Sequence, residues 1–358
     1  MTLPPAGPPA AGMHVLSVAF PFAPASVDAV GGAEQVLAAL DLALVRAGHR
    51  STVIACAGSR VAGALVEVPL WPEPIDDAVR AATHAAVRQA IAQTARDHRV
   101  DLIHLHGIDF AAYLPPPGLP VLATLHLPPS WYTAAALSPT RANTWLHGVS
   151  ASQHRALRTM APHARTLLPP IGNAVPVAAL GASRHRRHGF ALMLGRVCPE
   201  KGQHLALRAA HAAGIGLLIG GQVFPYEAHR RYFDEQVTPL LDSHRRFLGP
   251  LGFDRKRRLL TAAKCLLVPS LAAETSSLVA MEALACGTPV VAFAAGALPE
   301  VVADGRTGFV VHDVAEMVAA IGRVGEIRPQ ACRTAAQARF DLPRMTEAYL
   351  SRYRSLIG

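Results

Sequence analysis

Short runs of apolar residues alternate along almost the whole chain with longer segments in which apolar residues recur every three or four positions. The short runs are typical of strands buried on both faces, and the longer period indicates helices with one apolar side. This alternation predicts an α/β protein in which helices cover parallel sheets. The expected strands are residues 15–20, 52–55, 102–105, 121–125 and 146–149 in the first half, and 191–194, 216–219, 247–248, 265–269, 289–293 and 308–311 in the second.

The order of these segments divides the 358 residues into two doubly wound units. We expect an unstructured tail at 1–12, a first domain at 13–175, a Pro- and Gly-containing linker at 176–189, a second domain at 190–339 and a final helical segment at 340–358. Long helices are predicted at 77–97 and 342–357. The last helix follows the completed second sheet and carries Met345, Tyr349 and Tyr353 on one side, so we predict that it returns to cover the first domain.

The composition is that of a globular protein with a large core, with 51% hydrophobic and 16% charged residues. The longest apolar stretch, residues 278–298, contains Glu282, Gly287 and Pro289, which favours a buried helix, turn and strand over a membrane span. Five scattered cysteines without a C-x-x-C pair indicate neither a disulfide framework nor a zinc knuckle. We therefore expect a protein of the reducing cytoplasm, and the tail does not have the pattern of a secretory signal.

The formal charge of +9 raises the question of a nucleic-acid partner. The basic residues are mostly arginines scattered through helical segments, without the interleaved aromatic residues that stack on bases. We predict no nucleic-acid binding. Attraction to an anionic substrate, or peripheral contact with an acidic membrane surface, stays open.

Candidate chemistry lies where strands end, because ligands of open parallel sheets bind beyond the carboxyl ends of the strands. Gly31-Gly32 begins a helix after the first strand, although it lacks the G-x-G-x-x-G spacing of dinucleotide dehydrogenases. Arg196 and Lys201 follow the first strand of the second domain at another helix start. Two cations beside one crevice can neutralise a diphosphate.

Two carboxylates follow a later strand of the second domain. Glu274 precedes a helix for which the hydroxyl residues 275–277 are natural N-caps, and Glu282 lies inside that otherwise apolar helix. A buried carboxylate needs a donor, which here is either a ribose hydroxyl pair or a structural partner of the protein.

These residues, together with Cys286-Gly287-Thr288-Pro289, Pro299-Glu300-Val301 and Asp304-Gly305-Arg306-Thr307-Gly308, closely resemble the donor-binding domain of family 4 retaining glycosyltransferases, which have the GT-B fold. The first half is similar more loosely, through Gly31-Gly32-Ala33-Glu34, His104 and His106, Thr124-Leu125-His126, Val149-Ser150-Ala151-Ser152 and Gly172-Asn173. The resemblance runs from about Met13 to the C-terminus. It implies two Rossmann-like domains that face each other across a cleft, with the acceptor on the first and a nucleotide sugar on the second.

Carried onto this chain, the resemblance implies that Arg196 and Lys201 hold the diphosphate, that Glu282 binds the ribose and that Glu274 contacts the transferred sugar. His126 would line the sugar and acceptor site. The remaining donor-binding residues implied are Gly31, Gly32, Gly195, Gly220, Gly221, Thr275, Ser276, Ser277 and Leu278. The family usually has Gly-Phe-Gly where this chain has Thr275-Ser276-Ser277, so its sugar preference is open.

No metal or cofactor is expected beyond the nucleotide diphosphate sugar as co-substrate. His104 and His106 alone could be metal ligands, but no third ligand is apparent in the sequence, and there is no Asp-x-Asp pair. The resemblance thus implies metal-independent sugar transfer, with retention of configuration, to a hydroxyl of a glycan, lipid or natural product. The alternatives are a nucleotide-sugar epimerase of the same fold and a non-catalytic nucleotide-sugar-binding subunit.

Overall fold

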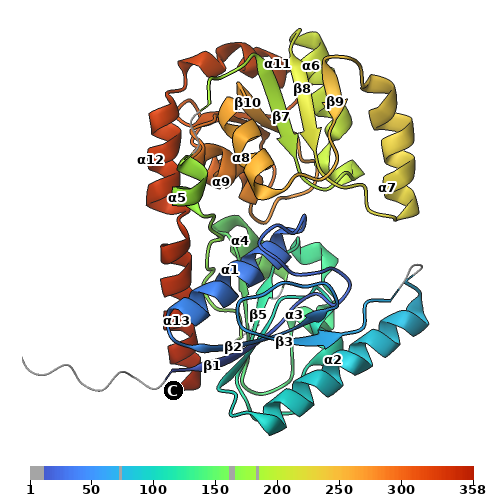
Figure 1. Cartoon of the computed structure of the whole chain (residues 1–358), viewed down its shortest axis with the longest axis vertical. Helices are drawn as coiled ribbons and strands as arrows, with labels where there is room; N and C mark the ends of the chain where they lie inside the picture. The colour runs from blue at the N-terminus through green and yellow to red at the C-terminus, as the bar shows by residue number, and fades with distance from the viewer. Residues whose placement is uncertain (1–11, 72–74, 161–165, 183–184) are drawn as a thin grey trace, which may run out of the picture.

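The computed structural model describes residues 12–71, 75–160, 166–182 and 185–358 and contains two six-stranded sheets, one in each half of the chain (Figure 1). Every pair of neighbouring strands is parallel. The first sheet has the order β3-β2-β1-β4-β5-β6 and the second β12-β11-β10-β7-β8-β9. Counted from its own first strand, the second sheet repeats the order of the first, so the prediction of two Rossmann-like sheets is confirmed.

The strands of the first sheet agree with the predicted positions to within a few residues, except for one that the sequence analysis missed. Their bounds are β1 His14–Val18, β2 Arg50–Cys56, β3 Ala64–Val68, β4 Leu102–Leu105, β5 Val121–Leu125 and β6 Thr144–Gly148. The missed strand is β3, at the edge of the sheet, where only Val68 is fully buried. An edge strand that is half exposed gives no apolar run to recognise.

Helices cover both faces of this sheet. They are α1 Gly32–Arg46, α2 Asp77–Asp97, α3 Ala134–Leu137 and α4 Ala151–Met160, with 3₁₀ turns at Phe110–Tyr113 and Pro129–Trp131. The predicted helix 77–97 is found with those bounds, and Asp76 accepts a hydrogen bond from the Val79 N–H at its start.

The second sheet consists of β7 Phe190–Leu194, β8 Gly216–Gly220, β9 Arg245–Phe247, β10 Cys265–Val268, β11 Val290–Phe293 and β12 Gly308–Val311. Its helices are α5 Val177–Gly181, α6 Gln203–Ala212, α7 Glu227–Tyr232, α8 Phe253–Ala262, α9 Leu278–Ala285, α10 Leu298–Val301, α11 Val314–Arg323 and α12 Pro329–Arg339. Short helical turns lie at Pro199–Lys201, Phe233–Val237, Thr238–Leu240 and Val324–Glu326.

The segment expected to be a linker is not free of structure. Helix α5 lies within it, and Val177 and Leu180 belong to the core cluster of the second domain. Sequence analysis does not identify this helix, because a five-residue helix is too short to show an apolar period. Residues 183–184 of the linker and 1–11 of the tail lie outside the described residues.

The last helix, α13 (Leu342–Ile357), leaves the second domain and runs beside α1 of the first (Figure 1). Met345, Tyr349 and Tyr353 lie in one apolar cluster with Val15, Leu40, Leu102 and Leu122 of the first domain. Both tyrosine side chains are completely buried there. The two ends of the described chain therefore share one core.

Among the described residues, no helix combines the length and the apolar character needed to cross a membrane.

Candidate functional site

A cavity of about 760 Å³ lies between the two domains, where the carboxyl ends of both sheets meet. Its volume is within the usual range for small-molecule sites. We call the side formed by the first domain the N-terminal wall; it includes Gly31, Gly32, Glu34, His106 and His126. The C-terminal wall includes Gly195, Arg196, Lys201, Glu274, Thr275, Ser276, Ser277, Leu278 and Glu282. The structure thus brings all but two of the predicted site residues into one cavity.

Two cations of the C-terminal wall come from the loop after β7. Arg196 follows the end of the strand, and Lys201 ends the turn that precedes α6. Gly202 has a left-handed φ of 70°, and a Cβ at this position would collide with the carbonyl of Pro269. Only glycine allows this close approach, which holds Lys201 against the end of β10.

Lys201 is paired with one of the predicted carboxylates. Its Nζ lies 2.5 Å from Glu274 Oε1, and the same oxygen accepts a hydrogen bond from Ser270 Oγ. Glu274 Oε2 has no hydrogen bond to any described residue, so this oxygen is available to a ligand in the cavity. A diphosphate at Lys201 would compete with Glu274 for the ammonium group.

The backbone of Glu274 is held by a contact that sequence reasoning missed. Gly296 has a φ of 58°, and a Cβ there would meet the backbone N and O of Glu274. The next residue, Ala297, donates its N–H to the Glu274 carbonyl at 2.7 Å. The sequence signal was the Ala-Ala-Gly-Ala run after β11, but nothing in it shows which loop the glycine meets.

The partner of Glu282 is a lysine. Glu282 is 3% exposed on α9, and its Oε1 lies 2.5 Å from Lys256 Nζ on α8. The need for a donor was foreseen, but Lys256 was not, because it is one of four consecutive basic residues at 255–258 that resemble an exposed helix face. Within the described part of the chain Glu282 Oε2 accepts no hydrogen bond, which leaves it open to ribose hydroxyls.

The hydroxyl residues before α9 do not act as the predicted caps. Helix α9 begins after Ser277 without a side-chain capping bond, and Thr275 Oγ1 donates instead to the carbonyl of His126 at 2.7 Å. This bond joins the two walls. The backbone N–H groups of 275–278 donate no hydrogen bond to a described residue, and all four residues line the cavity. Free N–H groups at a helix start suit an anion.

His126 begins a buried hydrogen-bonded chain in the N-terminal wall. Its Nε2 lies 3.0 Å from His106 Nδ1, and His106 Nε2 lies 3.2 Å from His104 Nδ1. The chain continues from His104 to the hydroxyls of Tyr353 and Thr124, at 2.8 Å and 2.7 Å. Both ring nitrogens of His104 and of His106 are therefore engaged by protein side chains.

Burial keeps these imidazoles neutral. It lowers the pKa of His126 to about 4, and it holds the pKa values of His104 and His106, which also face other histidines, well below 6.5. His106 and His126 therefore present neutral imidazoles in the N-terminal wall at physiological pH, beside the ionisable residues Asp28, Glu34 and Arg60 of the same wall.

Gly31 and Gly32 form the start of α1, where Gly31 is the N-cap residue. A Cβ on Gly31 would strike the carboxylate of Glu34, which lies 8% exposed beneath it. Burial raises the pKa of Glu34, although its own N–H and the charge of Arg196 act in the opposite direction. Sequence reasoning noted Glu34 only as part of the family motif.

Gly220 and Gly221 do not line the cavity. Gly195 N donates to the Gly220 carbonyl, and a Cβ on Gly221 would collide with the Gly195 carbonyl. These two glycines allow the ends of β7 and β8 to approach closely, and thereby shape the loop that carries Arg196. Their contribution is to the backbone behind the site.

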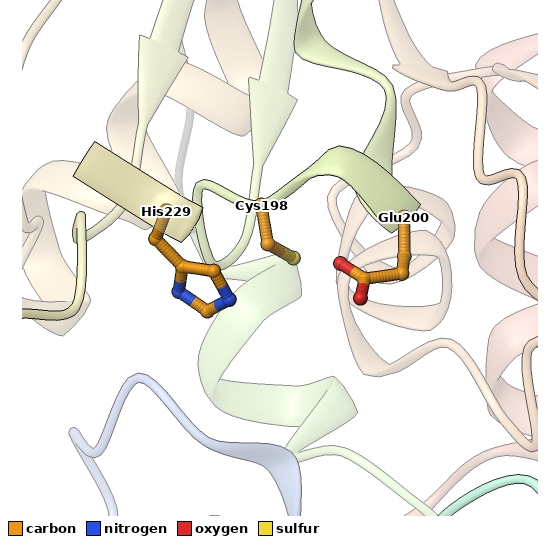
Figure 2. Close-up of side chains that lie close together, drawn as sticks. All are labelled: Cys198, Glu200 and His229. Atoms are coloured by element: carbon orange, nitrogen blue, oxygen red, sulfur yellow. The ribbon is translucent and has the colours of Figure 1, made fainter. Parts of the chain in front are cut away.

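One group in the described chain has the chemistry of a metal site. Cys198, Glu200 and His229, drawn in Figure 2, each offer one ligand atom, and these atoms all lie within 4.8 Å of one another. Burial raises the pKa of the Cys198 thiol to about 11, so without a metal ion the thiol is protonated at neutral pH. The charge of Arg196 also lowers the pKa of His229, after burial itself. A metal cation bound to these three residues would be repelled by the positive charge of Arg196.

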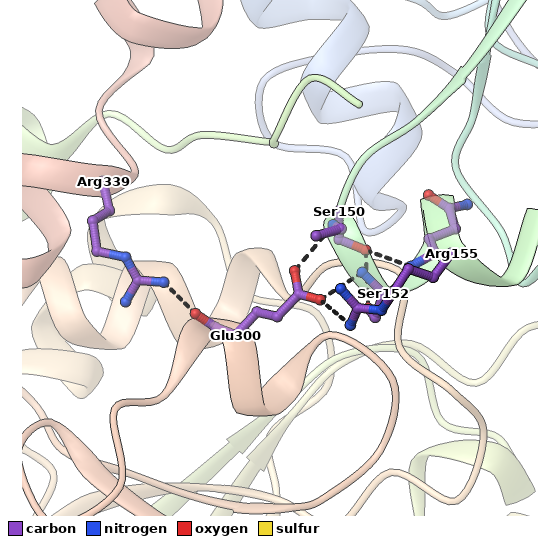
Figure 3. Close-up of polar contacts among 7 residues, drawn as sticks. Ser150, Ser152, Arg155, Glu300 and Arg339 are labelled. Atoms are coloured by element: carbon purple, nitrogen blue, oxygen red, sulfur yellow. Dashed lines mark hydrogen bonds and ion pairs between the residues drawn. The ribbon is translucent and has the colours of Figure 1, made fainter. Parts of the chain in front are cut away.

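A second polar link between the domains lies outside the cavity (Figure 3). Glu300, on α10 of the second domain, accepts hydrogen bonds from the N–H groups of Ala151 and Ser152 at the start of α4, at 3.0 and 2.5 Å. Arg155 lies 3.4 Å from the same carboxylate, and Arg339 donates to the Glu300 carbonyl. A carboxylate at a helix N-terminus is favourably placed, so this contact stabilises the observed domain arrangement.

Comparisons with known proteins agree with this geometry. The family model for "Glycosyltransferase Family 4" matches residues 30–167, and that for "Glycosyl transferases group 1" matches residues 189–326. The chain belongs to glycosyltransferase family 4. This family 4 glycosyltransferase is 34% identical over 197 residues to the D-inositol 3-phosphate glycosyltransferases of Mycobacterium bovis and Mycobacterium tuberculosis. The matched segment covers 51% of the chain and 40% of the length of those relatives.

Solved structures similar to this family 4 glycosyltransferase share its fold. A glycosyltransferase involved in avilamycin A biosynthesis has a TM-score of 0.70 at 24% identity, covering 96% of this chain and 98% of that one. Sucrose-phosphate synthase from Thermosynechococcus elongatus reaches a TM-score of 0.77 at 21% identity, covering 96% and 99%. Anabaena HepE in complex with UDP-glucose has a TM-score of 0.74 at 19% identity, and the match covers 96% of this chain and 100% of that one. The architecture is GT-B.

Proposed function

We propose that this chain transfers a sugar from a nucleotide diphosphate donor to an acceptor hydroxyl, with retention of configuration and without a metal ion. The supporting observation is the pair Glu274 and Glu282. One oxygen of each carboxylate is anchored by a lysine, and the other is left open on the same cavity wall as Arg196. Two carboxylate oxygens that can accept hydrogen bonds, on either side of a cation, suit a nucleotide sugar. Such a molecule has hydroxyls at both ends and a diphosphate between them.

In this proposal the nucleotide ribose meets Glu282, and the transferred sugar meets Glu274. Arg196, Lys201 and the free N–H groups of 275–278 stabilise charge on the leaving diphosphate as the glycosidic bond breaks. The acceptor hydroxyl attacks from the side of the N-terminal wall, and the leaving phosphate takes its proton. The UDP-glucose bound in Anabaena HepE supports a nucleotide sugar as the donor.

The acceptor would occupy the part of the cavity lined by aromatic residues of the first domain. Phe20, Phe22, Trp131 and Tyr132 lie there, and Trp131 is 41% exposed. Aromatic faces of this kind pack against the apolar faces of sugar rings and other ring systems. We propose a glycan or ring-containing natural product, and cytoplasmic location with peripheral membrane contact stays a prediction.

The decisive experiment incubates the purified full chain with a panel of nucleotide sugars and candidate acceptors, and follows nucleotide release and product mass. We expect acceptor-dependent release of a nucleoside diphosphate and a product heavier than the acceptor by one glycosyl residue. Epimerisation of the donor without an acceptor would instead identify an epimerase. Tight nucleotide-sugar binding without consumption by any acceptor would indicate a non-catalytic subunit.

A further inference from the structure

The buried chain that begins at His126 has one end whose direction is fixed. His147 Nδ1 lies 2.9 Å from the carbonyl of Gly148, and a carbonyl can only accept. His147 therefore carries its proton on Nδ1, and its Nε2 is an acceptor. Thr124 Oγ1, 2.7 Å away, must donate its single proton to that nitrogen.

This orientation determines every later bond. Because the Thr124 proton is used on His147, Thr124 Oγ1 accepts from His104 Nε2–H at 2.7 Å and from the Tyr349 hydroxyl at 3.3 Å. His104 Nδ1 is then an acceptor, and it receives the Tyr353 hydroxyl at 2.8 Å.

The same logic reaches the cavity. His104 Nδ1 has one lone pair, which faces His106 Nε2 at 3.2 Å as well as the Tyr353 hydroxyl. An unprotonated His106 Nε2 would set a second lone pair against it, so His106 carries its proton on Nε2 and shares this acceptor with Tyr353. His106 Nδ1 is consequently an acceptor and receives His126 Nε2–H at 3.0 Å. The rings of His106 and His126 are inclined by only 17° with centroids 5.2 Å apart, as an in-plane N–H···N bond requires.

The other nitrogen of His126 meets the cavity. Within the described residues His126 Nδ1 has no hydrogen-bond partner, and it is not among the fully buried polar atoms that lack one. We infer that the chain of His147, Thr124, His104 and His106 holds His126 as its Nε2–H tautomer, which presents the Nδ1 lone pair to the substrate as a hydrogen-bond acceptor. Thr124 and His104 are positioning residues that act through His106.

A bare lone pair accepts from a hydroxyl and repels phosphate or carboxylate oxygens. The group that meets His126 is therefore a hydroxyl of the transferred sugar or of the acceptor, and this identification rests on the proposed function. The tautomer itself does not. Tyr349 and Tyr353 place α13 against the chain, so the last helix of the sequence supports a side chain in the cavity.

The test is a long-range ¹H–¹⁵N spectrum of the full chain labelled at histidine, recorded at pH 7 without substrate. Neutral Nδ1–H and Nε2–H tautomers give different patterns in such spectra, and His126→Gln identifies the signals of His126 by their loss. We expect the Nε2–H pattern for His126 in the wild type. An Nδ1–H pattern or an imidazolium would overturn the inference.

Matched variants test the cause. Thr124→Val removes the hydroxyl at nearly constant volume, and we expect a mixture of His126 tautomers; Thr124→Ser keeps the hydroxyl and should keep the wild-type pattern. An unchanged His126 pattern in Thr124→Val would show that the chain does not set the tautomer. If Thr124→Val does not fold, His147→Gln serves instead, because its terminal amide can both donate and accept and thus removes the fixed direction.

This measurement needs no turnover. A protein that fails to transfer any sugar but shows the expected His126 tautomer would overturn the proposed function and leave the inference intact. A protein that transfers sugar but shows a different His126 tautomer would overturn the inference and leave the proposed function intact.

Discussion

The two walls of the cavity come from domains of the same topology, yet the buried polar groups at their centres differ in charge. The C-terminal wall carries full charges, with Arg196 and two lysine–glutamate pairs. The N-terminal wall carries histidines that burial keeps neutral. A strand order thus fixes where a site lies, and the residues that follow the strands decide whether it holds an anion or a hydroxyl.

The largest expected effect comes from removing the charge of the C-terminal wall. Lys201→Ala or Arg196→Ala should lower kcat by about a hundredfold to a thousandfold, since each removes stabilisation of the leaving diphosphate. Nucleotide release at saturating donor measures this. Lys256→Ala is the comparison, because it contacts the proposed ribose end: it should mainly raise the donor KM. Turnover unchanged in both Lys201→Ala and Arg196→Ala would remove the proposed mechanism.

A smaller loss of activity should follow from disturbing the neutral histidines of the N-terminal wall. Thr124→Val should lower kcat by roughly tenfold to a hundredfold, where each factor of ten corresponds to about 1.4 kcal/mol of lost positioning. The dissociation constant for the nucleoside diphosphate, measured by calorimetry, should not change, because no nucleotide contact is altered.

Two controls separate positioning from packing. Thr124→Ser should retain most of the activity. Tyr113→Phe, which removes a buried hydroxyl of the first domain bonded to Asp109 rather than to the chain, should also retain it. Equal losses in Thr124→Val and Tyr113→Phe would indicate general destabilisation instead.

The difference between the walls also predicts how stability depends on pH. Burial lowers the pKa of His126 to about 4 and that of His147 to about 3, the latter with a smaller contribution from Arg352. In the unfolded chain both titrate near 6.5, so between that pH and about 4 the unfolded state binds more protons. Stability is therefore retained above pH 6.5 and lost as the pH falls.

At pH 5 this linkage costs about 2 kcal/mol for each histidine that stays neutral in the folded state. Urea unfolding at pH 7 and pH 5 measures it, and His147→Gln should weaken the dependence. A free energy of unfolding that is equal at the two pH values would show that His126 and His147 are not held neutral in the folded protein.

Sequence reasoning found the charged wall more completely than the neutral one, and the reason is physical. Arg196, Lys201 and Glu274 each stand near a strand end or helix start that the apolar pattern marks, and Glu282 is the one carboxylate inside the apolar helix that follows. Their partners depend on long-range contacts: Lys256 lies 26 residues from Glu282, and nothing local shows that α8 faces α9.

The neutral wall did leave a signal. His104 and His106, and Thr124 and His126, alternate along two strands, so each pair points to one side of the sheet. His147 lies opposite Thr124 in the register of β5 and β6. The period alone, however, does not show that α13 returns with Tyr353 to complete the chain, because that pairing spans 249 residues.

The contact between the domains outside the cavity should matter less than either wall. Glu300→Gln removes the negative charge at the start of α4, a loss of roughly 0.3 to 1 kcal/mol for a partly exposed carboxylate at a helix N-terminus. We expect a rise of a few-fold at most in the donor KM, with kcat retained. Glu316→Gln, at an exposed position on α11, is the matched control. A loss of kcat in Glu300→Gln as large as that in Lys201→Ala would mean that Glu300 acts on the chemistry.

The smallest effect is predicted for metal removal, and it tests whether the C-terminal wall is sufficient by itself for a diphosphate. A metal ion would be the other means of neutralising the donor, and Cys198, Glu200 and His229 are the candidate ligand set within the described residues. The Cys198 thiol, with a pKa raised to about 11, must lose a proton to bind a metal ion, and the guanidinium of Arg196 opposes a second positive charge.

Dialysis against a chelator should therefore leave the initial rate unchanged. Cys198→Ser should transfer sugar at the wild-type rate with or without added Mg²⁺, Mn²⁺ or Zn²⁺. A rate that falls on chelation and returns with one of these ions would show that arginine, lysine and helix N–H groups do not neutralise the donor unaided. If Cys198→Ser then failed to respond to that ion, the site in Figure 2 would be where the ion binds.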